Sequence, residues 1–258
     1  MRISVVLPVL TPTPFLRAMT EFTIKTLRAH ADKPFELVVV EAAHNHFDPA
    51  LQDYEGWHQI DKYINFNPKI GAIKEFNAGA CAATGDFIVS TGNDVIVPPH
   101  WDTELLRCFE ERKDCGVAAL SAFEPGAIIG PPSAKDCIVE GMYSPFMMWR
   151  RGRLMDEAYR KIYCDSDFIM QVYESGQRAY RSCRAHVHHL LRMTSDRVAP
   201  EEHGRDLAHD ERLFYLRWGK SPLAMFAMIR CGAYQYGREW DSFNMPINLH
   251  YDPDKVED

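Results

Sequence analysis

Short apolar runs alternate with segments of helical period along the first half of the chain, and this alternation constrains the fold more than any other feature. Ile3–Val9 and Phe35–Glu41 are continuous runs rich in β-branched residues, which is typical of strands buried in a parallel sheet. Residues 14–30 between them place apolar side chains at helical spacing. Parallel strands need crossover connections, so the pattern predicts right-handed βαβ units in an α/β fold, with a mostly parallel central sheet flanked by helices.

The same alternation continues through the first half of the chain and becomes irregular in the second half. Strands are expected at residues 60–66, 86–91, 116–121 and 178–184. Helices are expected at 69–83, 99–112, 165–175 and 206–218. Between the third and fourth strands of this list the pattern is less regular: a mixed apolar stretch is expected at 137–149 and a charged turn and helix through 150–160. An extended segment is expected after the last helix. No linker is long enough to separate an independent domain, so residues 1–258 are predicted to form one domain.

Composition narrows the class of protein. The formal net charge of −7 disfavours a broad nucleic-acid footprint, and seven cysteines without a CxxC pair argue against a disulfide framework and a cysteine zinc site. No segment reaches the roughly 18 apolar residues that a membrane span needs. The first ten residues superficially resemble a signal peptide, but Pro8 interrupts the apolar run and no small-residue cleavage site follows. We therefore expect a buried first strand and a cytoplasmic location.

Polar residues just past the carboxyl ends of the strands are the first candidates for a site, because ligands of parallel sheets bind there. They are Thr11, Thr13, Glu41 to His46, and Gly92 to Asp94. A buried carboxylate at Asp94 needs a partner, and a hard divalent cation shared with phosphate oxygens would supply one. The alternative is an ordinary Asn-Asp turn, which is the commoner use of such residues when they are taken alone.

Two acidic residues open the expected helix over 165–175. Asp165 and Asp167 both suit helix capping and the helix dipole, which is the usual reason for acids in a first turn. The functional alternative is that one carboxylate faces a cleft and deprotonates an acceptor hydroxyl as a general base. Residues two apart diverge on a helix, so the two acids are not expected to share one role.

A histidine cluster follows the strand expected at 178–184. In an extended segment His186 and His188 point one way and His189 the other, so a three-histidine zinc site from this run alone is disfavoured. One histidine acting as a metal ligand beside Asp94 is the functional interpretation. Structural or exposed roles are expected for the other two.

The order and spacing of these segments resemble the family 2 glycosyltransferases, whose fold is GT-A. The opening run Ile3 to Pro8 is similar to the family's first strand, and Val38 to Glu41 is similar to its second strand, which usually ends in an acid that reads the donor base. The matching motifs that follow are Asn67-Pro68-Lys69-Ile70-Gly71, Asn77-Ala78-Gly79, Ala83 to Ile88, Asn93-Asp94, Met148-Trp149-Arg150-Arg151, Asp156 to Tyr159, Cys164 to Phe168, Val187-His188-His189 and Leu216-Arg217-Trp218-Gly219. The resemblance covers roughly residues 3–219.

The resemblance implies roles for individual residues. Those expected to bind the donor are Pro8, Glu41, Asn67, Asn77, Asn93 and Trp149. Among them, Pro8 and Glu41 would line the nucleobase pocket, with Glu41 accepting from the base. Asn93 would lie near the ribose or diphosphate, and Trp149 against the donor sugar or acceptor. The expected domain parts are a nucleotide-sugar half over 1–122, an acceptor and catalytic half over 123–194, and a tail over 195–258.

The resemblance also implies a chemistry. Asp94 and His189 would hold Mn²⁺ or Mg²⁺, and Asp165 would be the catalytic base of an inverting transfer from a nucleotide-diphosphate sugar, with UDP favoured. The chain departs from the family where Gly92 replaces the first acid of D-x-D and Cys164 replaces a Glu, and where Ala42-Ala43-His44-Asn45 stands in place of the usual "DGS". The first departure leaves fewer carboxylates for the metal, and the last bears on base preference.

The acceptor is open at this level. A glycan, a small molecule, a protein or a hydroxylated pyrimidine in viral DNA would each fit, the last because of the basic runs Arg150 to Arg153 and Arg178 to Arg184. Oligomeric state is likewise open. A nucleotidyltransferase is a weaker alternative, because the turn after the first strand has no glycine-rich phosphate loop. A non-catalytic sugar-nucleotide-binding module is the third alternative.

Overall fold

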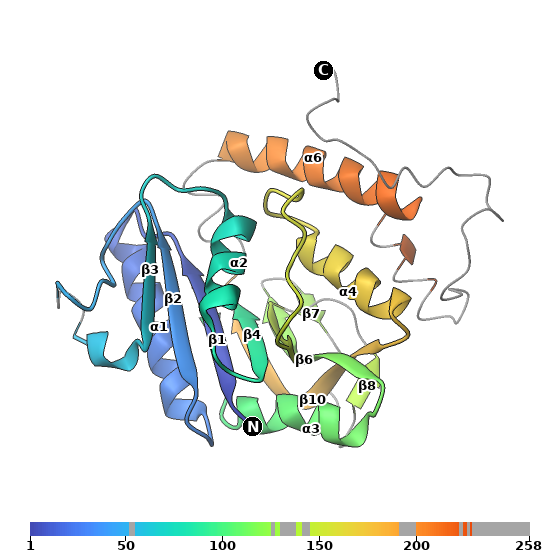
Figure 1. The fold of residues 1–258 in the computed structure, drawn as a ribbon, viewed down its shortest axis with the longest axis horizontal. Coiled ribbons are helices and arrows are strands. Elements are labelled where there is room, and N and C mark those ends of the chain that lie inside the picture. The colour runs from blue at the N-terminus through green and yellow to red at the C-terminus, as the bar shows by residue number, and fades with distance from the viewer. Residues whose placement is uncertain are drawn as a thin grey trace.

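One sheet of ten strands organises the part of the chain that the computed structural model describes, which is residues 1–51, 55–124, 127–129, 138–140, 145–190, 200–221, 224, 225 and 228 (Figure 1). The strands are β1 (Ile3–Val9), β2 (Glu36–Ala42), β3 (Lys62–Phe66), β4 (Phe87–Thr91), β5 (Val95–Ile96), β6 (Cys115–Glu124), β7 (Ala127–Ile129), β8 (Ile138–Glu140), β9 (Phe146–Arg150) and β10 (Arg178–His189). The helices are α1 (Pro14–His30), η1 (Trp57–Gln59), α2 (Ala72–Ala82), α3 (Trp101–Glu111), α4 (Cys164–Glu174) and α6 (Pro200–Trp218).

The sheet has a parallel half and a mixed half. Its order is β3-β2-β1-β4-β9-β6-β10-β5, and the first four strands run parallel to one another. β9 enters between β4 and β6 and is antiparallel to both, whereas β10 is parallel to β6. The two-residue β5 then pairs antiparallel with the end of β10. The parallel sheet expected for the first half is confirmed, and the irregular second half builds the mixed region.

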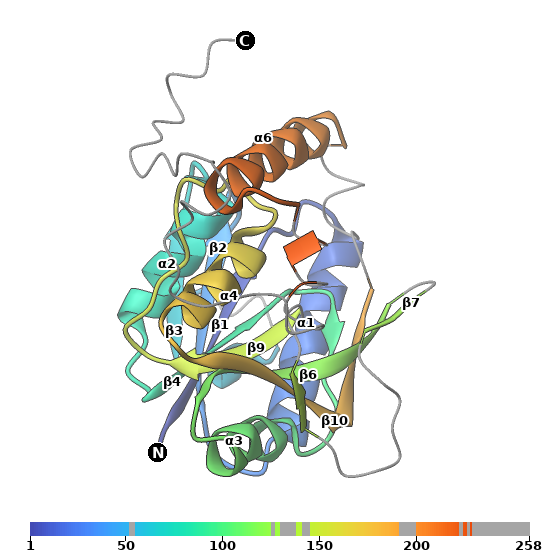
Figure 2. The same cartoon turned by 90° about the vertical axis from the view of Figure 1, so that its right-hand side faces the viewer.

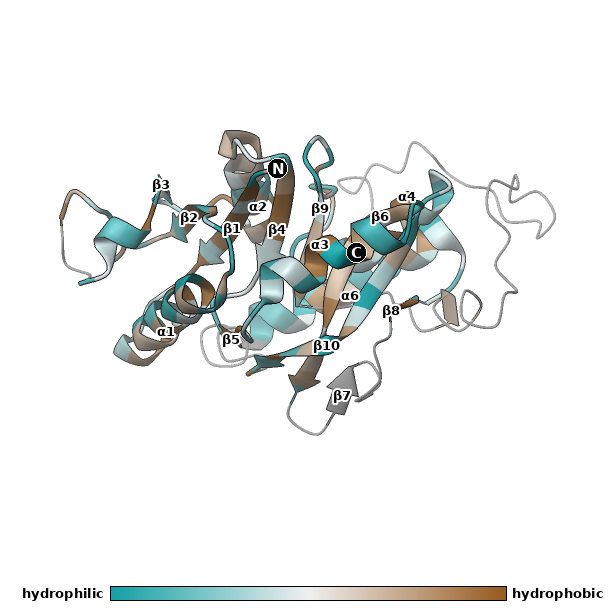
Figure 3. Cartoon of the chain, turned by 90° about the horizontal axis from the view of Figure 1, so that it is seen from below, coloured by the Kyte–Doolittle hydropathy of each residue, from teal (hydrophilic) through white to brown (hydrophobic). Residues whose placement is uncertain are grey.

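Helices cover both faces of the sheet, because alternate strand residues point to opposite faces. Val5 and Leu7 belong to the core that includes residues of α1 and α3, whereas Val6 belongs to the core that includes residues of α2, α4 and α6. Figure 2 shows α2 and α4 on one side of the sheet and α1 on the other. The central strands β1 and β4 are coloured largely brown in Figure 3, as burial on both faces requires.

Close packing places α2 directly over β1 and β2. A Cβ at Gly79 would lie 2.7 Å from Val6 Cγ1 and 2.6 Å from Val40 Cγ2, so only glycine fits without movement of these stiff side chains. α2 follows the parallel strand β3 and runs back over the sheet. Its first turn therefore lies above the carboxyl ends of β1 and β2, where a ligand is expected.

One expected helix is wrong. Residues 151–163 form a loop in place of the charged turn and helix expected through 150–160. Gly152 has a φ of 115°, which breaks helical geometry, and the backbone of the loop bonds to distant side chains instead. The helix expected at 206–218 begins at Pro200, and the extended finish expected after it lies outside the described residues. No helix in the described ranges is long and apolar enough to cross a membrane.

α6 fixes the loop that leads to Asp165. The carboxylate of Asp210 on α6 is 0% exposed and accepts hydrogen bonds from the backbone N–H groups of Arg160, Lys161 and Ile162 at 2.9, 2.9 and 2.7 Å. A buried carboxylate is stable only with such donors. Asp210 therefore links α6 to the loop immediately before α4.

A second buried carboxylate ties the other end of α6 to α4. Asp167 is 0% exposed and accepts from Arg217 Nη1 at 2.9 Å, from Trp218 Nε1 at 2.8 Å and from the Tyr159 hydroxyl at 3.1 Å. Asp165, two residues earlier, makes none of these contacts. The two acids that open α4 thus face different surroundings, as their spacing predicts.

Removal of the Asp210 carboxylate should loosen the loop it holds. Asp210→Ala leaves three backbone N–H groups without an acceptor, and each costs about 1–3 kcal/mol where water cannot replace it, so we expect a loss of about 2–4 kcal/mol in the free energy of unfolding. Amide hydrogen exchange at residues 160–162 should accelerate in parallel. Glu211→Ala, at the exposed neighbouring position, is the control. Unchanged protection of residues 160–162 in Asp210→Ala would contradict this role.

Candidate functional site

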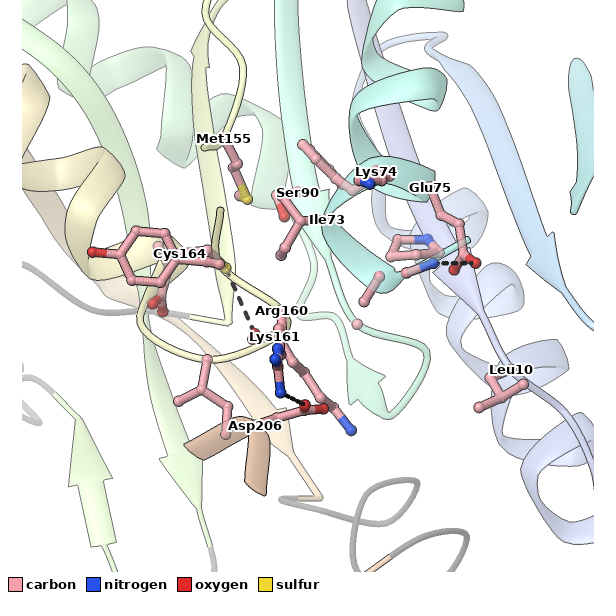
Figure 4. A pocket seen from close by; sticks show the side chains of 18 of the residues that line it. Leu10, Ile73, Lys74, Glu75, Ser90, Met155, Arg160, Lys161, Cys164 and Asp206 are labelled. Carbon is pink, nitrogen blue, oxygen red and sulfur yellow. Dashed lines mark hydrogen bonds and ion pairs between the residues drawn. The ribbon is translucent and has the colours of Figure 1, made fainter. Parts of the chain in front are cut away.

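A cleft of about 1020 Å³ opens beyond the carboxyl ends of β1, β2 and β4. Its walls are the ends of these strands, the first turn of α2, the loop over 155–163, the first turn of α4, the end of β10 and the first half of α6 (Figure 4). The volume lies at the upper end of the range for small-molecule sites. Of the residues expected from sequence, Pro8, Asn93, Asp94, Asp165 and His189 line this cleft.

Asp94 and His189 meet in the cleft although 95 positions separate them in the chain. The pairing of β5 with β10 places Val95 opposite His189, and Leu190 N donates to the Asp94 carbonyl at 3.0 Å. As a result His189 Nε2 lies 3.6 Å from Asp94 Oδ1. Both side chains are largely buried, at 13% and 11% exposed.

Glu124 orients the His189 ring from the other side. His189 Nδ1 lies 2.7 Å from Glu124 Oε1, and a carboxylate can only accept, so Nδ1 carries the proton of this hydrogen bond. Burial lowers the pKa of His189, but the hydrogen bonds and charges of Asp94 and Glu124 outweigh it and raise the pKa. Sequence reasoning missed Glu124, although its position at the end of β6 is the same signal that drew attention to Asp94.

The donor set suits a divalent cation that phosphate oxygens also coordinate. One carboxylate oxygen and one imidazole nitrogen 3.6 Å apart can share a cation, and a metal-binding histidine commonly donates its other N–H to a carboxylate, as His189 does to Glu124. Within the described ranges, no group of three histidine, cysteine or acidic side chains could hold a metal by itself. A Cβ at Gly92 would lie 2.8 Å from Asp94 Oδ1, so glycine leaves this oxygen clear.

Asp165 stands at the start of α4 on another wall of the same cleft. Tyr163 precedes the helix with a φ of 58°, and Ser166 N donates to Asp165 Oδ1 at 2.7 Å. Burial raises the pKa of Asp165 above that of an ordinary aspartate, against the opposing effect of the Ser166 hydrogen bonds. A carboxyl group of this kind suits proton transfer, because its basicity is higher than that of a solvated aspartate.

Glu41 faces the loop after β2, not the cleft. Its carboxylate is 0% exposed; Oε1 accepts from Thr11 Oγ1 at 3.1 Å and His46 N at 3.0 Å, and Oε2 accepts from Phe47 N at 3.0 Å and the Tyr63 hydroxyl at 2.8 Å. Four donors therefore occupy the side chain that was expected to accept from the donor base. Glu41 thus holds the loop after β2 in place beside the cleft.

Two further residues expected to contact the donor, Trp149 and Asn77, do not line the cleft. Trp149 is 0% exposed, packs against Phe76 and Phe168, and donates its indole N–H to Arg153 O at 3.2 Å, so it is a core residue and the expected contact with the sugar is corrected. Asn77 is 3% exposed and bonds both ways with the Met155 backbone, at 2.8 and 3.1 Å. It fixes the 151–163 loop instead of touching a ligand.

The remaining two asparagines, Asn67 and Asn93, differ in whether they line the cleft. Asn67 is exposed and lies outside the cleft lining. Asn93 does line the cleft, but its side-chain nitrogen donates to Thr20 Oγ1 at 3.1 Å and its backbone carbonyl accepts from Thr23 Oγ1 at 3.1 Å. Asn93 therefore anchors the turn that carries Asp94 to α1.

The other two histidines of the cluster pack against a residue of the sheet. His186 and His188 both contact the Phe123 ring, at centroid distances of 4.8 and 5.1 Å, whereas His189 faces Asp94. The alternation predicted for this run is confirmed. A zinc site built from the three histidines is excluded by that arrangement.

Three arginines of the basic runs contact neighbouring side chains at the surface, away from the cleft. Arg150 lies opposite Phe87 at the amino end of β4, with its guanidinium 4.9 Å from that ring centroid. Arg153 donates to Ser175 and Gln177, and Arg178 pairs with Asp114 and Glu140. None of these arginines lines the cleft. These three arginines therefore do not point to a DNA acceptor at the cleft.

Several solved structures with a similar fold contain UDP or a UDP-sugar. The chain is similar to S. aureus TarS 1–349 in complex with UDP (TM-score 0.58, 18% identity, 73% of this chain and 60% of that chain) and in complex with UDP-GlcNAc (0.58, 18%, 83% and 67%). It is also similar to GalNAc-T7 with UDP, GalNAc and Mn²⁺ (0.63, 14%, 94% and 53%). The chain thus spans about half to two thirds of these proteins, and such identities establish the fold alone.

Family membership rests on the sequence itself. No curated protein matches the chain significantly. The sequence model for Glycosyl transferase family 2 matches residues 4–156 of the 258, which includes β1 to β6, β9 and the Asp94 turn. This match over more than half of the chain shows that the chain belongs to glycosyl transferase family 2, and the similar structures share its fold.

Proposed function

We propose that the protein catalyses inverting transfer of a sugar from a UDP-sugar to an acceptor hydroxyl, with Asp165 as general base and a divalent metal at Asp94 and His189. The observation that carries the proposal is the cleft itself: the largely buried Asp94–His189 pair, with Glu124 behind it, shares the cleft with a carboxyl of raised pKa. An acid positioned for a proton and a pair positioned for a cation are the two requirements of this reaction.

The donor class is supported by the similar structures. TarS was solved with UDP and with UDP-GlcNAc, and GalNAc-T7 with UDP, GalNAc and Mn²⁺. In this chain the ends of β1 and β2 offer Pro8, Leu10 and Ala42 as an apolar floor for a nucleobase. The Asp94 turn lies beyond β4, two strands along from β2 in the sheet, so a diphosphate placed there would leave the sugar near α4.

The reaction is a single displacement. Asp165 accepts the proton of the acceptor hydroxyl as its oxygen forms a bond to the anomeric carbon of the donor sugar. The bond from that carbon to the diphosphate oxygen breaks, and its electron pair leaves with the UDP. Asp210 and Asp167 keep the start of α4 in place during these events through the contacts described above. The sugar passes through a state with oxocarbenium character.

Asp94 and His189 act on the leaving group. A divalent cation, when bound, supplies positive charge to the diphosphate as negative charge develops on it. Asp94 Oδ1 and His189 Nε2 would hold that cation, and Glu124 keeps the lone pair of Nε2 directed toward it. Two protein ligands leave several coordination positions for phosphate oxygens and water, so the donor would complete the site.

The base is tested by Asp165→Asn. Loss of a positioned base should lower kcat by about 10²- to 10⁴-fold, measured as UDP release from a panel of UDP-sugars with Mn²⁺ and candidate acceptors, while the Kd for UDP stays within twofold. Because the pKa of Asp165 is raised, wild-type activity should fall with decreasing pH at a higher pH than an ordinary aspartate would give. Asp61→Asn, a surface aspartate away from the cleft, is the control. Undiminished turnover in Asp165→Asn would remove the residue from this role.

The metal is tested by titration of Mn²⁺ and Mg²⁺ into the chelator-treated protein. Wild-type donor hydrolysis should depend on the cation, and Asp94→Ala should raise the half-saturating Mn²⁺ concentration at least about tenfold, because it removes one of two protein ligands. His188→Ala, next to His189 but on the opposite face of β10, should keep the wild-type value. Full activity after chelation, or an equal response of both variants, would contradict a metal at this position.

A further inference from the structure

Glu75 on α2 has one carboxylate oxygen engaged and the other unused. Oε1 accepts hydrogen bonds from Ile70 N at 2.9 Å and Gly71 N at 3.2 Å, which fixes the segment entering the helix. No donor in the described part of the chain bonds to Oε2. The residue is nevertheless 5% exposed and belongs to the lining of the cleft. A carboxylate this buried is costly unless its second oxygen also finds a donor.

The position of Glu75 is the base side of the cleft. Gly79, one turn further along α2, packs on Val6 and Val40, so the first turn of the helix lies above the ends of β1 and β2. In Figure 4 Glu75 lies toward Leu10, whereas Cys164, Arg160 and Asp206 lie on the other side of the cleft. The acid therefore faces the end of the cleft where Pro8, Leu10 and Ala42 form the floor.

The strand-end acid cannot take this role. Glu41 has both oxygens saturated by four donors and is 0% exposed, so a nucleoside could reach it only by displacing them. Glu75 Oε2 is the acceptor that remains at this end of the cleft among the described acidic residues. In sequence it is hidden, because a lone Glu in an alanine-rich helix is read as a solvent-facing residue.

We propose that Glu75 Oε2 is the group that recognises the donor nucleoside, by accepting the imide N–H of a uracil ring. The inference rests on the proposed function, and it moves base recognition from β2 to α2. Uracil presents a donor at N3 and cytosine presents an acceptor there. A carboxylate oxygen at this point therefore favours UDP and repels CDP. Oε1 meanwhile holds the backbone of Ile70 and Gly71 at the start of α2, so the same side chain supports the pocket and recognises the base.

The test is Glu75→Gln, with binding of UDP and CDP measured by calorimetry in the presence of Mn²⁺. The amide oxygen of Gln can still accept from Ile70 and Gly71, while its NH₂ group replaces Oε2 and reverses the hydrogen bond offered to the base. A hydrogen bond to a charged group is strong enough that we expect UDP affinity to fall about tenfold or more. CDP affinity should stay the same or rise. Glu201→Gln, an exposed acid on α6 outside the cleft lining, should leave the ratio of the two affinities unchanged.

Three results would overturn the inference. The first is an equal loss of UDP and CDP affinity in Glu75→Gln. The second is a loss of UDP affinity that disappears when 2′-deoxy-UDP is the ligand, which would assign Glu75 to the ribose. The third is wild-type protein that binds UDP and CDP with equal affinity. The last measurement needs no variant, so it stands even if Glu75→Gln does not fold. Failure of the wild type to bind any nucleotide would instead overturn the proposed function itself.

Discussion

Buried carboxylates that accept backbone N–H groups hold three of the segments around the cleft in place. Glu41 fixes the loop after β2, Glu75 the entrance of α2, and Asp210 the loop before α4. Each of these acids would be costly to bury alone, and each loop would lose its shape without its acid. The cleft is thus supported by charge-assisted hydrogen bonds more than by regular secondary structure, which explains how irregular segments form a defined site.

The number of hydrogen-bond donors around each acid separates those that hold the structure from those that can act on a ligand. Asp167 and Asp165 are two residues apart, but Asp167 is enclosed by Arg217, Trp218 and Tyr159 while Asp165 lies on the cleft. Saturation by donors is the distinguishing property. An acid whose oxygens are all occupied organises the protein, and one with an oxygen to spare can meet a ligand or a proton.

The sequence predicts the frame of the molecule better than its site. Apolar periodicity places β1, α1 and β2 within a residue of their observed bounds, because burial on the sheet dictates that period. The order of the family motifs correctly predicts that Asp94 and His189 lie beside each other. Trp149, Glu41 and Asn77 are misread, since a motif gives a residue's position along a strand but not whether its side chain meets a ligand or a neighbouring loop. Glu124 escapes notice because its partner His189 is far away in sequence, and Glu75 because a lone Glu in an alanine-rich helix is read as a solvent-facing residue. The division of the domain at 122 and 194 stays a prediction.

The two-residue strand β5 has a consequence for how the protein matures. Asp94 lies in the first half of the chain, and His189 reaches it only when the end of β10 pairs with β5 at the edge of the sheet. Contacts between such distant segments form late, since their loop-closure entropy must be overcome first. A chain still emerging from the ribosome, with its parallel half already folded, would lack the Asp94–His189 pair. The Asp94–His189 pair would then be assembled only as the last strand docks at the sheet edge.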